Sequence, residues 1–207
     1  MLQNIQWLGH ASFKIKGKES VIYIDPFKIT GGEQADIIII THEHFDHLSP
    51  DDIKKIIKPS TVFVATPDCA SKLKGIAASI KSIMPFQSVS IGNIKIEAIP
   101  SYNINKNFHP KSNNWIGVVI NIDGKRIYHA GDTDFVPEMK SLKNIDVALL
   151  PVSGTYVMTA EEATYAANFF MPKIAVPMHY GSIIGSKADA EIFKKLCRCN
   201  VEIMEKV

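Results

Sequence analysis

Residues 41–47 of this 207-residue chain read THEHFDH. It contains three of the seven histidines of the chain and directly follows the apolar run IIII at residues 37–40. A continuous apolar run of this length is typical of a strand that is buried on both faces. Ser49, Pro50 and the acids after them predict the start of a helix. The histidines therefore lie between the C-terminal end of a strand and the N-terminus of a helix.

The side chains of this segment are those that bind divalent metals. Zinc and similar ions accept neutral imidazole nitrogen and carboxylate oxygen as ligands. Residues two apart at the end of a strand point to the same side, so His42 and His44 can reach one ion. The turn that follows directs Asp46 and His47 toward a second ion. The alternative is a polar surface loop with no ligand. Four ligands do not complete a dinuclear site, so further ligands must come from elsewhere.

Two later segments supply candidates for these ligands. Asp132, in the sequence AGDT, follows a strand predicted at residues 126–130. His179, in the sequence PMHYG, follows a strand predicted from residue 174. A carboxylate can bridge two ions about 3.5–4 Å apart, which can then share a hydroxide, and a further imidazole can complete one of them. The same arrangement, a ligand directly after a buried strand, thus occurs three times along the chain.

The order of the predicted elements favours an α/β fold with two sheets packed face to face and helices outside. Caps and periodicity predict helices after Ser49, at residues 67–74, from Thr159 to about residue 170, and at residues 187–196. Residues 103–114 are polar and aperiodic, which predicts a loop. The strands are predicted at residues 6–8, 12–15, 21–24, 36–41, 61–65, 95–100, 115–121, 126–130, 146–151 and 174–178.

Composition indicates a single soluble domain over residues 1–207. Hydrophobic residues make up 46% and charged residues 21% of the chain, as in ordinary globular proteins. The net charge of +2 is too small to favour nucleic acid or an anionic membrane as partner, so we expect a small-molecule substrate. The three cysteines have no zinc-site spacing, and no signal peptide or membrane-length apolar run is visible, so we expect a cytoplasmic protein. Assembly into a homo-oligomer is left open.

The motifs THEHFDH, AGDTD and PMHYG, in this order, resemble those of the metallo-β-lactamase superfamily of hydrolases. The opening WLGHASFKI, followed by YIDPF, is similar to a narrower branch of small metal-dependent hydrolases. That branch is akin to ascorbate-6-phosphate lactonase and to phospholipase D of the N-acylphosphatidylethanolamine type. The resemblance implies a four-layer αβ/βα sandwich with a dinuclear zinc or manganese site. It implies that the first ion is bound by His42 and His44, the second by Asp46, His47 and His179, and both by Asp132.

The chain departs from the superfamily pattern at one ligand of the first ion. The superfamily has a histidine at the end of the strand before the Asp132 segment, where this chain has Tyr102 and Asn103. His109 lies a few residues further on, in the predicted loop, and is the candidate replacement. The alternatives are a first site completed by water and a His109 that contacts the substrate instead.

His10 and Asp25 are further candidates, and each has an ordinary structural alternative. His10 could be a packed or surface histidine, but its match to the opening motif of the branch implies an active-site residue that orients the substrate. Asp25 could be a helix-capping or turn residue, whereas the resemblance implies that it hydrogen-bonds a ligating imidazole and fixes its tautomer.

We therefore expect a metal-dependent hydrolase that uses a metal-bound hydroxide on a small ester, lactone or phosphoester. Asp46 would accept the proton of the attacking water, and His10 and residues 103–114 would shape the substrate pocket. The alternatives are a phosphodiesterase or nuclease on the same fold and a non-catalytic metal-binding module. A diiron branch of the superfamily has a glutamate at the second ligand position, where this chain has His44, so iron–oxygen chemistry is disfavoured.

Overall fold

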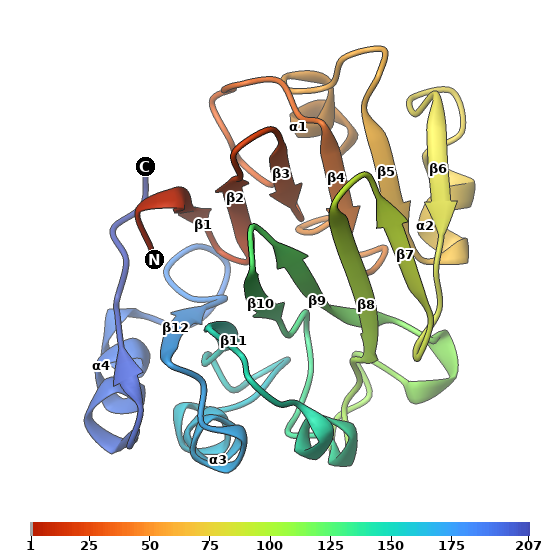
Figure 1. The fold of residues 1–207 in the computed structure, drawn as a ribbon. Helices are drawn as coiled ribbons and strands as arrows, with labels where there is room; N and C mark the ends of the chain where they lie inside the picture. The colour runs from red at the N-terminus through yellow and green to blue at the C-terminus, as the bar shows by residue number, and fades with distance from the viewer. Residues whose placement is uncertain (1) are drawn as a thin grey trace. The chain divides into compact units, whose positions relative to one another are not determined.

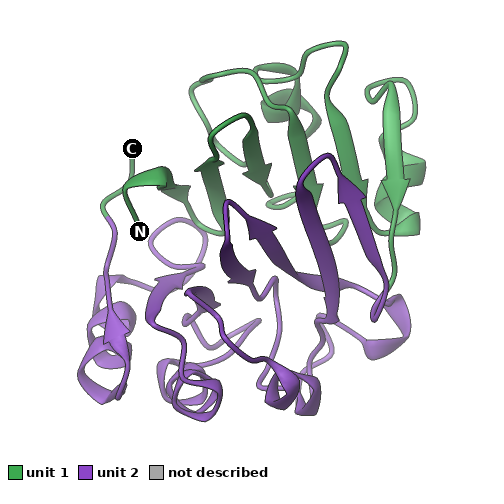
Figure 2. Ribbon diagram, viewed as in Figure 1, with its two compact units in different colours: residues 1–84, 205–207 green, residues 85–204 purple. Residues whose placement is uncertain are grey.

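The computed structural model describes residues 2–207, which divide into two compact units (Figure 2). The first unit runs to Met84 and includes the C-terminal residues Glu205–Val207, and the second comprises Pro85–Met204. Each unit contains one β-sheet, so the mixed α/β class and the two sheets predicted from the sequence are confirmed. The single domain expected over residues 1–207 stays a prediction.

The first unit is built on a six-stranded sheet in the order β1-β2-β3-β4-β5-β6 (Figure 1). The strands β1, β2 and β3 pair antiparallel, whereas β3 to β6 are parallel. The elements of this unit are η1 (Leu2–Asn4), β1 (Ile5–Gly9), β2 (Ser12–Lys16), β3 (Val21–Ile24), β4 (Ile37–Ile40), α1 (Pro50–Lys54), β5 (Val62–Ala65), α2 (Pro67–Lys72) and β6 (Ser79–Ser82).

The apolar run of the sequence forms the central strand β4 of this sheet. All four isoleucines of β4 are buried, as expected for a parallel strand covered on both faces. Ile38 and Ile40 pack in a core cluster with Tyr23, Phe63 and Ile53. Because β1, β3 and β4 run in the same direction, the chain leaves all three at one edge of the sheet. His10, Asp25 and residues 41–47 follow these three strands directly.

The second unit is built on a seven-stranded sheet in the order β13-β12-β11-β10-β9-β8-β7. The strands β7 to β10 pair antiparallel, and β10 to β13 pair parallel. The elements of this unit are β7 (Ser88–Ile91), β8 (Ile94–Pro100), η2 (Lys111–Asn113), β9 (Ile116–Ile122), β10 (Lys125–His129), η3 (Pro137–Ser141), β11 (Val147–Pro151), α3 (Ala160–Phe170), β12 (Ile174–Met178), α4 (Lys187–Leu196) and β13 (Asn200–Val201).

The two longer helices of this unit pack on its parallel strands (Figure 1). The helix α3 opens with a capping box between Thr159 and Glu162 and contacts β11, while α4 contacts β12. The strands β8, β10, β11 and β12 run in one direction, so their C-terminal ends share one edge of the sheet. The segments that leave this edge begin at residues 101, 130, 152 and 179.

The elements expected from the sequence are present with small shifts of their ends, and α3, β12 and α4 end where predicted. Three strands were missed, namely β6, β7 and β13. They are short, and several of their side chains are exposed, so their apolar pattern is too brief to predict a strand. The predicted loop at residues 103–114 contains the short 3-10 helix η2. Within residues 2–207, no helix combines the length and apolarity needed to cross a membrane.

Candidate metal centre

His42 and His44 lie side by side in the loop after β4. The Nε2 atom of His42 is 3.1 Å from the Nδ1 atom of His44, and the two ring centroids are 4.7 Å apart. A tetrahedral zinc ion with Zn–N bonds of about 2.0–2.1 Å separates two nitrogen ligands by roughly 3.3–3.4 Å. The two nitrogen atoms therefore have nearly the spacing that one shared ion requires.

The hydrogen bonds behind His42 define its tautomer. The hydroxyl of Thr41 donates to Asp25 Oδ2 over 2.6 Å, so its oxygen accepts the hydrogen of His42 Nδ1, 3.0 Å away. A neutral imidazole that donates from one nitrogen carries a lone pair on the other. The Nε2 atom of His42 is therefore a potential metal ligand.

Asp25 plays the same part for His47. Its carboxylate is fully buried and accepts from the backbone N–H of Thr41 at 2.8 Å and from His47 Nδ1 at 2.7 Å. A carboxylate that holds one ring nitrogen of a histidine fixes the ring and raises the basicity of the other nitrogen. Asp25 thus prepares Nε2 of His47 directly and Nε2 of His42 through Thr41.

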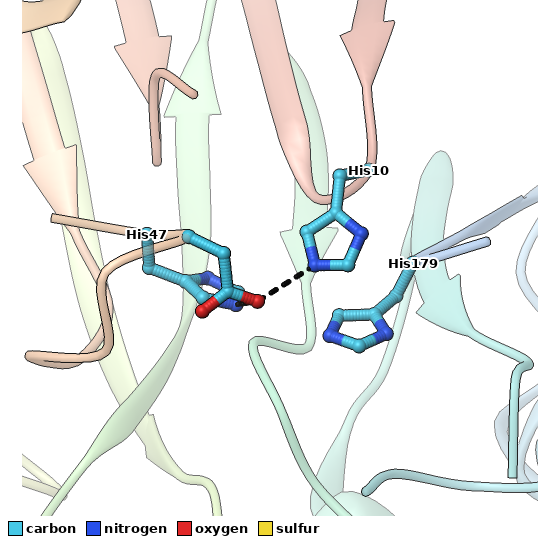
Figure 3. A group of neighbouring side chains, drawn as sticks. His10, His47 and His179 are labelled. Carbon is cyan, nitrogen blue, oxygen red and sulfur yellow. Dashed lines mark hydrogen bonds and ion pairs between the residues drawn. The ribbon is translucent and has the colours of Figure 1, made fainter. Parts of the chain in front are cut away.

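Asp46 lies between His47 and His10. Its Oδ2 atom is 2.8 Å from His10 Nε2, the interaction drawn as a dashed line in Figure 3, and 3.7 Å from His47 Nε2. His10 is buried, and its carbonyl accepts a hydrogen bond from Trp7 Nε1 at 2.9 Å. The predicted active-site histidine therefore contacts a predicted metal ligand.

In the second unit, Asp132 contacts two histidines. Its Oδ2 atom is 2.9 Å from His179 Nε2 and 3.4 Å from His109 Nε2, and all three side chains are buried. The resemblance implied that Asp132 and His179 share an ion, whereas His109 was a candidate ligand with two alternatives. The structure brings His109 to Asp132, although it lies on the loop after β8.

Three oxygen atoms lie within hydrogen-bonding distance of the Nδ1 atoms of these two histidines. Ser153 Oγ lies 3.0 Å from His179 Nδ1, and His109 Nδ1 is 3.1 Å from Asn103 Oδ1 and 3.2 Å from the carbonyl of Tyr156. Asn103 was expected only within the loop that shapes the substrate pocket, and Ser153 was not expected to be functional. The available signal was their position, since each follows a strand at the edge of the sheet where the ligands lie.

Strained backbone positions aim several of these side chains. His10, Asp25 and His179 have φ angles of 52°, 45° and 60°, in the left-handed region that non-glycine residues rarely adopt. Each lies at the end of a strand, and such a residue costs on the order of 1 kcal/mol or more. Gly131 also has a positive φ, and a Cβ atom there would lie 2.8 Å from the carbonyl oxygen of Ile116.

The neighbours of the ligands in sequence make other contacts. Glu43 forms an ion pair of 2.8 Å with Lys72, and the Phe45 side chain is 69% exposed. His129 is buried, and its Nδ1 atom accepts a hydrogen bond from the backbone N–H of Gly131. These contacts leave the donor set to imidazole and carboxylate groups.

This donor set suits a divalent transition metal. The described residues include clusters of histidine and aspartate that could hold such an ion. Imidazole nitrogen is a good ligand for zinc, copper, iron and nickel, whereas magnesium and calcium prefer oxygen alone. A buried group of imidazole and carboxylate ligands therefore fits a divalent transition-metal ion.

Comparisons with known proteins agree with this assignment. The family model described as beta-lactamase superfamily domain matches residues 4–179. A UPF0173 metal-dependent hydrolase from Thermococcus onnurineus is 35% identical, over 97% of this chain and 94% of its own. One from Pyrococcus abyssi is 34% identical, over 93% and 91%.

Solved structures are also similar to this chain over nearly its whole length. The crystal structure of a protein from Parabacteroides distasonis superposes with a TM-score of 0.87 at 37% identity, covering 97% of this chain and 92% of that one. Igni18, a metallo hydrolase from Ignicoccus hospitalis, superposes with a TM-score of 0.81 at 25% identity, over 98% and 94%.

Proposed function

This chain belongs to the metallo-β-lactamase superfamily of metal-dependent hydrolases, and we propose that it hydrolyses a small ester, lactone or phosphoester at a site for two divalent ions. The observation that carries the proposal is the preparation of the histidines. The Nδ1 atoms of His47, His109 and His179 all have hydrogen-bond partners, which leaves Nε2 as the ligand atom.

The ligand sets follow from the chemistry of the side chains and the order of the family motifs. Asp132 would bind both ions, because a carboxylate has two oxygen atoms to share. We assign His42, His44 and His109 to the first ion, and Asp46, His47 and His179 to the second. Zinc is favoured over manganese for both, because imidazole ligands outnumber carboxylates.

The bound ions would supply an activated water for attack and stabilise the negative charge that develops on the substrate. Asp46 is the residue that would accept a proton, since its carboxylate is buried and held in place. His10 Nε2, 2.8 Å from Asp46, would hold this carboxylate by donating a hydrogen bond to it. His10 would thereby orient the proton acceptor as well as the substrate.

An apolar part of the substrate would bind to the loop before His109. Ile104 and Phe108 on this loop are exposed, and Phe108 packs edge-on against Tyr156 with ring centroids 4.7 Å apart. Exposed apolar side chains next to a ligand are suited to an acyl or aromatic group. We therefore propose substrates that join an apolar group to the hydrolysed bond.

The test combines metal analysis with an activity panel. The purified protein should contain about two zinc ions per chain and should hydrolyse at least one of a set of p-nitrophenyl esters, lactones and phosphodiesters. Asp46→Asn and His47→Ala should abolish this activity, as should chelation. Glu43→Gln is the matched control, because Glu43 lies between the ligands in sequence, whereas its carboxylate forms an ion pair with Lys72.

Hydrolysis that persists in both variants and after chelation would refute the proposal. Metal that is retained without hydrolysis of any substrate would instead identify a metal-binding module. Salt-sensitive cleavage of RNA, with esters and lactones untouched, would identify a nuclease on the same fold.

A further inference from the structure

We propose that Asp134 and Asn103 form a hydrogen-bonded relay that positions His109 and fixes its tautomer for metal binding. The inference rests on the proposed function, because it concerns a ligand of the proposed first ion. Asn103 stands where the superfamily has a histidine, and Asp134 lies two residues after Asp132. One segment would then supply both a metal ligand and the anchor for another.

Asn103 holds His109 at three points. The backbone N–H of Asn103 donates to the carbonyl of His109 over 2.8 Å. The Oδ1 atom of Asn103 lies 3.0 Å from the backbone nitrogen of His109 and 3.1 Å from its Nδ1 atom. These bonds close the loop between the two residues and bring the imidazole to the end of β8.

Asp134 sets the orientation of the Asn103 amide. It is buried, and its Oδ1 atom lies 3.1 Å from Asn103 Nδ2 and 2.6 Å from Lys106 Nζ. Its Oδ2 atom accepts from the backbone N–H of Ile104 at 2.8 Å. The carboxylate thus bonds four consecutive residues of the loop, 103–106, and Lys106 compensates its charge.

The hydrogen-bond donors and acceptors of this relay have one consistent arrangement. An ionised carboxylate only accepts hydrogen bonds, so the NH₂ end of the Asn103 amide must face Asp134. Its Nδ2 atom also donates to the carbonyl of Tyr156 at 2.9 Å, which requires the same orientation. The amide oxygen therefore faces His109 and accepts the hydrogen on Nδ1. The lone pair of His109 is consequently on Nε2, the atom that faces Asp132.

The relay explains why a loop histidine can serve as a ligand here. A flexible loop would lose side-chain freedom on binding an ion, which weakens affinity. In the folded protein His109 is buried and bonded to Asn103, which is in turn bonded to Asp134. The imidazole is therefore ordered before an ion binds, and binding does not have to restrict it. Asp134 and Asn103 are positioning residues, since Asp134 acts on Asn103 and Asn103 acts on His109.

The experiment compares metal binding in variants of the full-length protein. We expect each of three variants to bind one of the two zinc ions about 10–100-fold more weakly, as measured by competition with a chelator. The variants are His109→Ala, Asn103→Ala and Asp134→Asn. Each should also change the visible spectrum of the cobalt-substituted protein in the same way. Asn107→Ala is the matched control, because Asn107 is an exposed asparagine of the same loop, and it should match the unaltered protein.

A double variant tests whether the residues act through His109. His109→Ala combined with Asn103→Ala should bind zinc as His109→Ala does, within about twofold, because the relay has no second route to the ion. Thermal unfolding in chelator shows whether each variant folds. If Asn103→Ala does not fold, Asp134→Asn decides, because it keeps the size of the side chain.

The outcomes separate the relay from the proposed function. If His109→Ala loses an ion while Asn103→Ala and Asp134→Asn keep both, the relay is wrong and His109 is still a ligand. If His109→Ala keeps both ions and its cobalt spectrum, the relay is also wrong. In either case the hydrolase proposal is judged separately, by Asp46→Asn and His47→Ala.

Discussion

Replacing Asp25 by asparagine should destabilise the protein even when no metal is present. The carboxylate of Asp25 is fully buried and accepts three hydrogen bonds, two from Thr41 and one from His47. Asparagine has nearly the same shape, so the substitution leaves no cavity. It replaces one acceptor oxygen by an NH₂ group, which can only donate.

The magnitude follows from these three bonds. A hydrogen bond to a charged group contributes about 1.5–3 kcal/mol, and a buried donor that loses its partner costs about 1–3 kcal/mol. In Asp25→Asn one oxygen still accepts, but the NH₂ group faces either the backbone N–H of Thr41 or both Thr41 Oγ1 and His47 Nδ1, all of which donate in the native arrangement. We expect a loss of about 3–5 kcal/mol in the free energy of unfolding, as for a broken buried pair.

Urea unfolding in the presence of a chelator measures this loss without any contribution from bound metal. With an m-value of about 3 kcal/mol/M, the expected change lowers the midpoint by roughly 1–1.5 M. Asp51→Asn is the control, because the Asp51 side chain is 92% exposed, and its midpoint should not move. A midpoint for Asp25→Asn within about 0.3 M of the unaltered protein would refute the reasoning, since 0.3 M corresponds to only about 1 kcal/mol.

Three further predictions concern the metal, one turn and the acid limit of stability. Zinc at 100 times its dissociation constant should stabilise the protein by about 2.7 kcal/mol, which calorimetry would record as a rise of roughly 5–10 °C, and chelator should reverse it. Gly131→Ala should lower zinc content in elemental analysis, because its Cβ would clash with the Ile116 carbonyl and displace Asp132; unchanged content would contradict this. Burial disfavours the charged form of Asp52, but hydrogen bonds from Lys55 and Ser49 outweigh it and lower its pKa below the ordinary 3.8. Its contribution to stability is therefore present above pH 3.8 and lost as the pH falls further, so Asp52→Asn should flatten this acid dependence in urea titrations.

The fold could be predicted where local pattern and burial agree. The strand β4 is buried on both faces and has an uninterrupted apolar run, and α3 carries its own capping box. The strands β6 and β7 were missed, because each has only four residues and several of their side chains are exposed. Each is the edge strand of its sheet, and its position is set by pairing with the neighbouring strand, β6 with β5 and β7 with β8. Such pairing is not written in the sequence of the strand itself.

In the candidate site, too, the residues of one local segment could be predicted, whereas those that depend on tertiary structure could not. His42, His44, Asp46 and His47 share one short segment, so their spacing alone indicated a metal site. The groups that orient the histidines come from distant parts of the chain. Asp25 bonds His47 across 22 positions, and Ser153 bonds His179 across 26. These partners meet because parallel strands end at one edge of a sheet, and that register depends on tertiary structure.

The chemistry of these partners suggests that the histidines are not equivalent ligands. His47 is held by the carboxylate of Asp25, His109 by the amide of Asn103 and His179 by the hydroxyl of Ser153. A charged acceptor raises the basicity of an imidazole more than a neutral one, and a hydroxyl can turn to donate instead. Removing the partner should therefore weaken zinc binding most for Asp25→Asn, less for Asn103→Ala and least for Ser153→Ala. Chelator competition on the three variants measures this order, and a Ser153→Ala effect as large as that of Asp25→Asn would show that the charge of the acceptor is not what tunes the ligand.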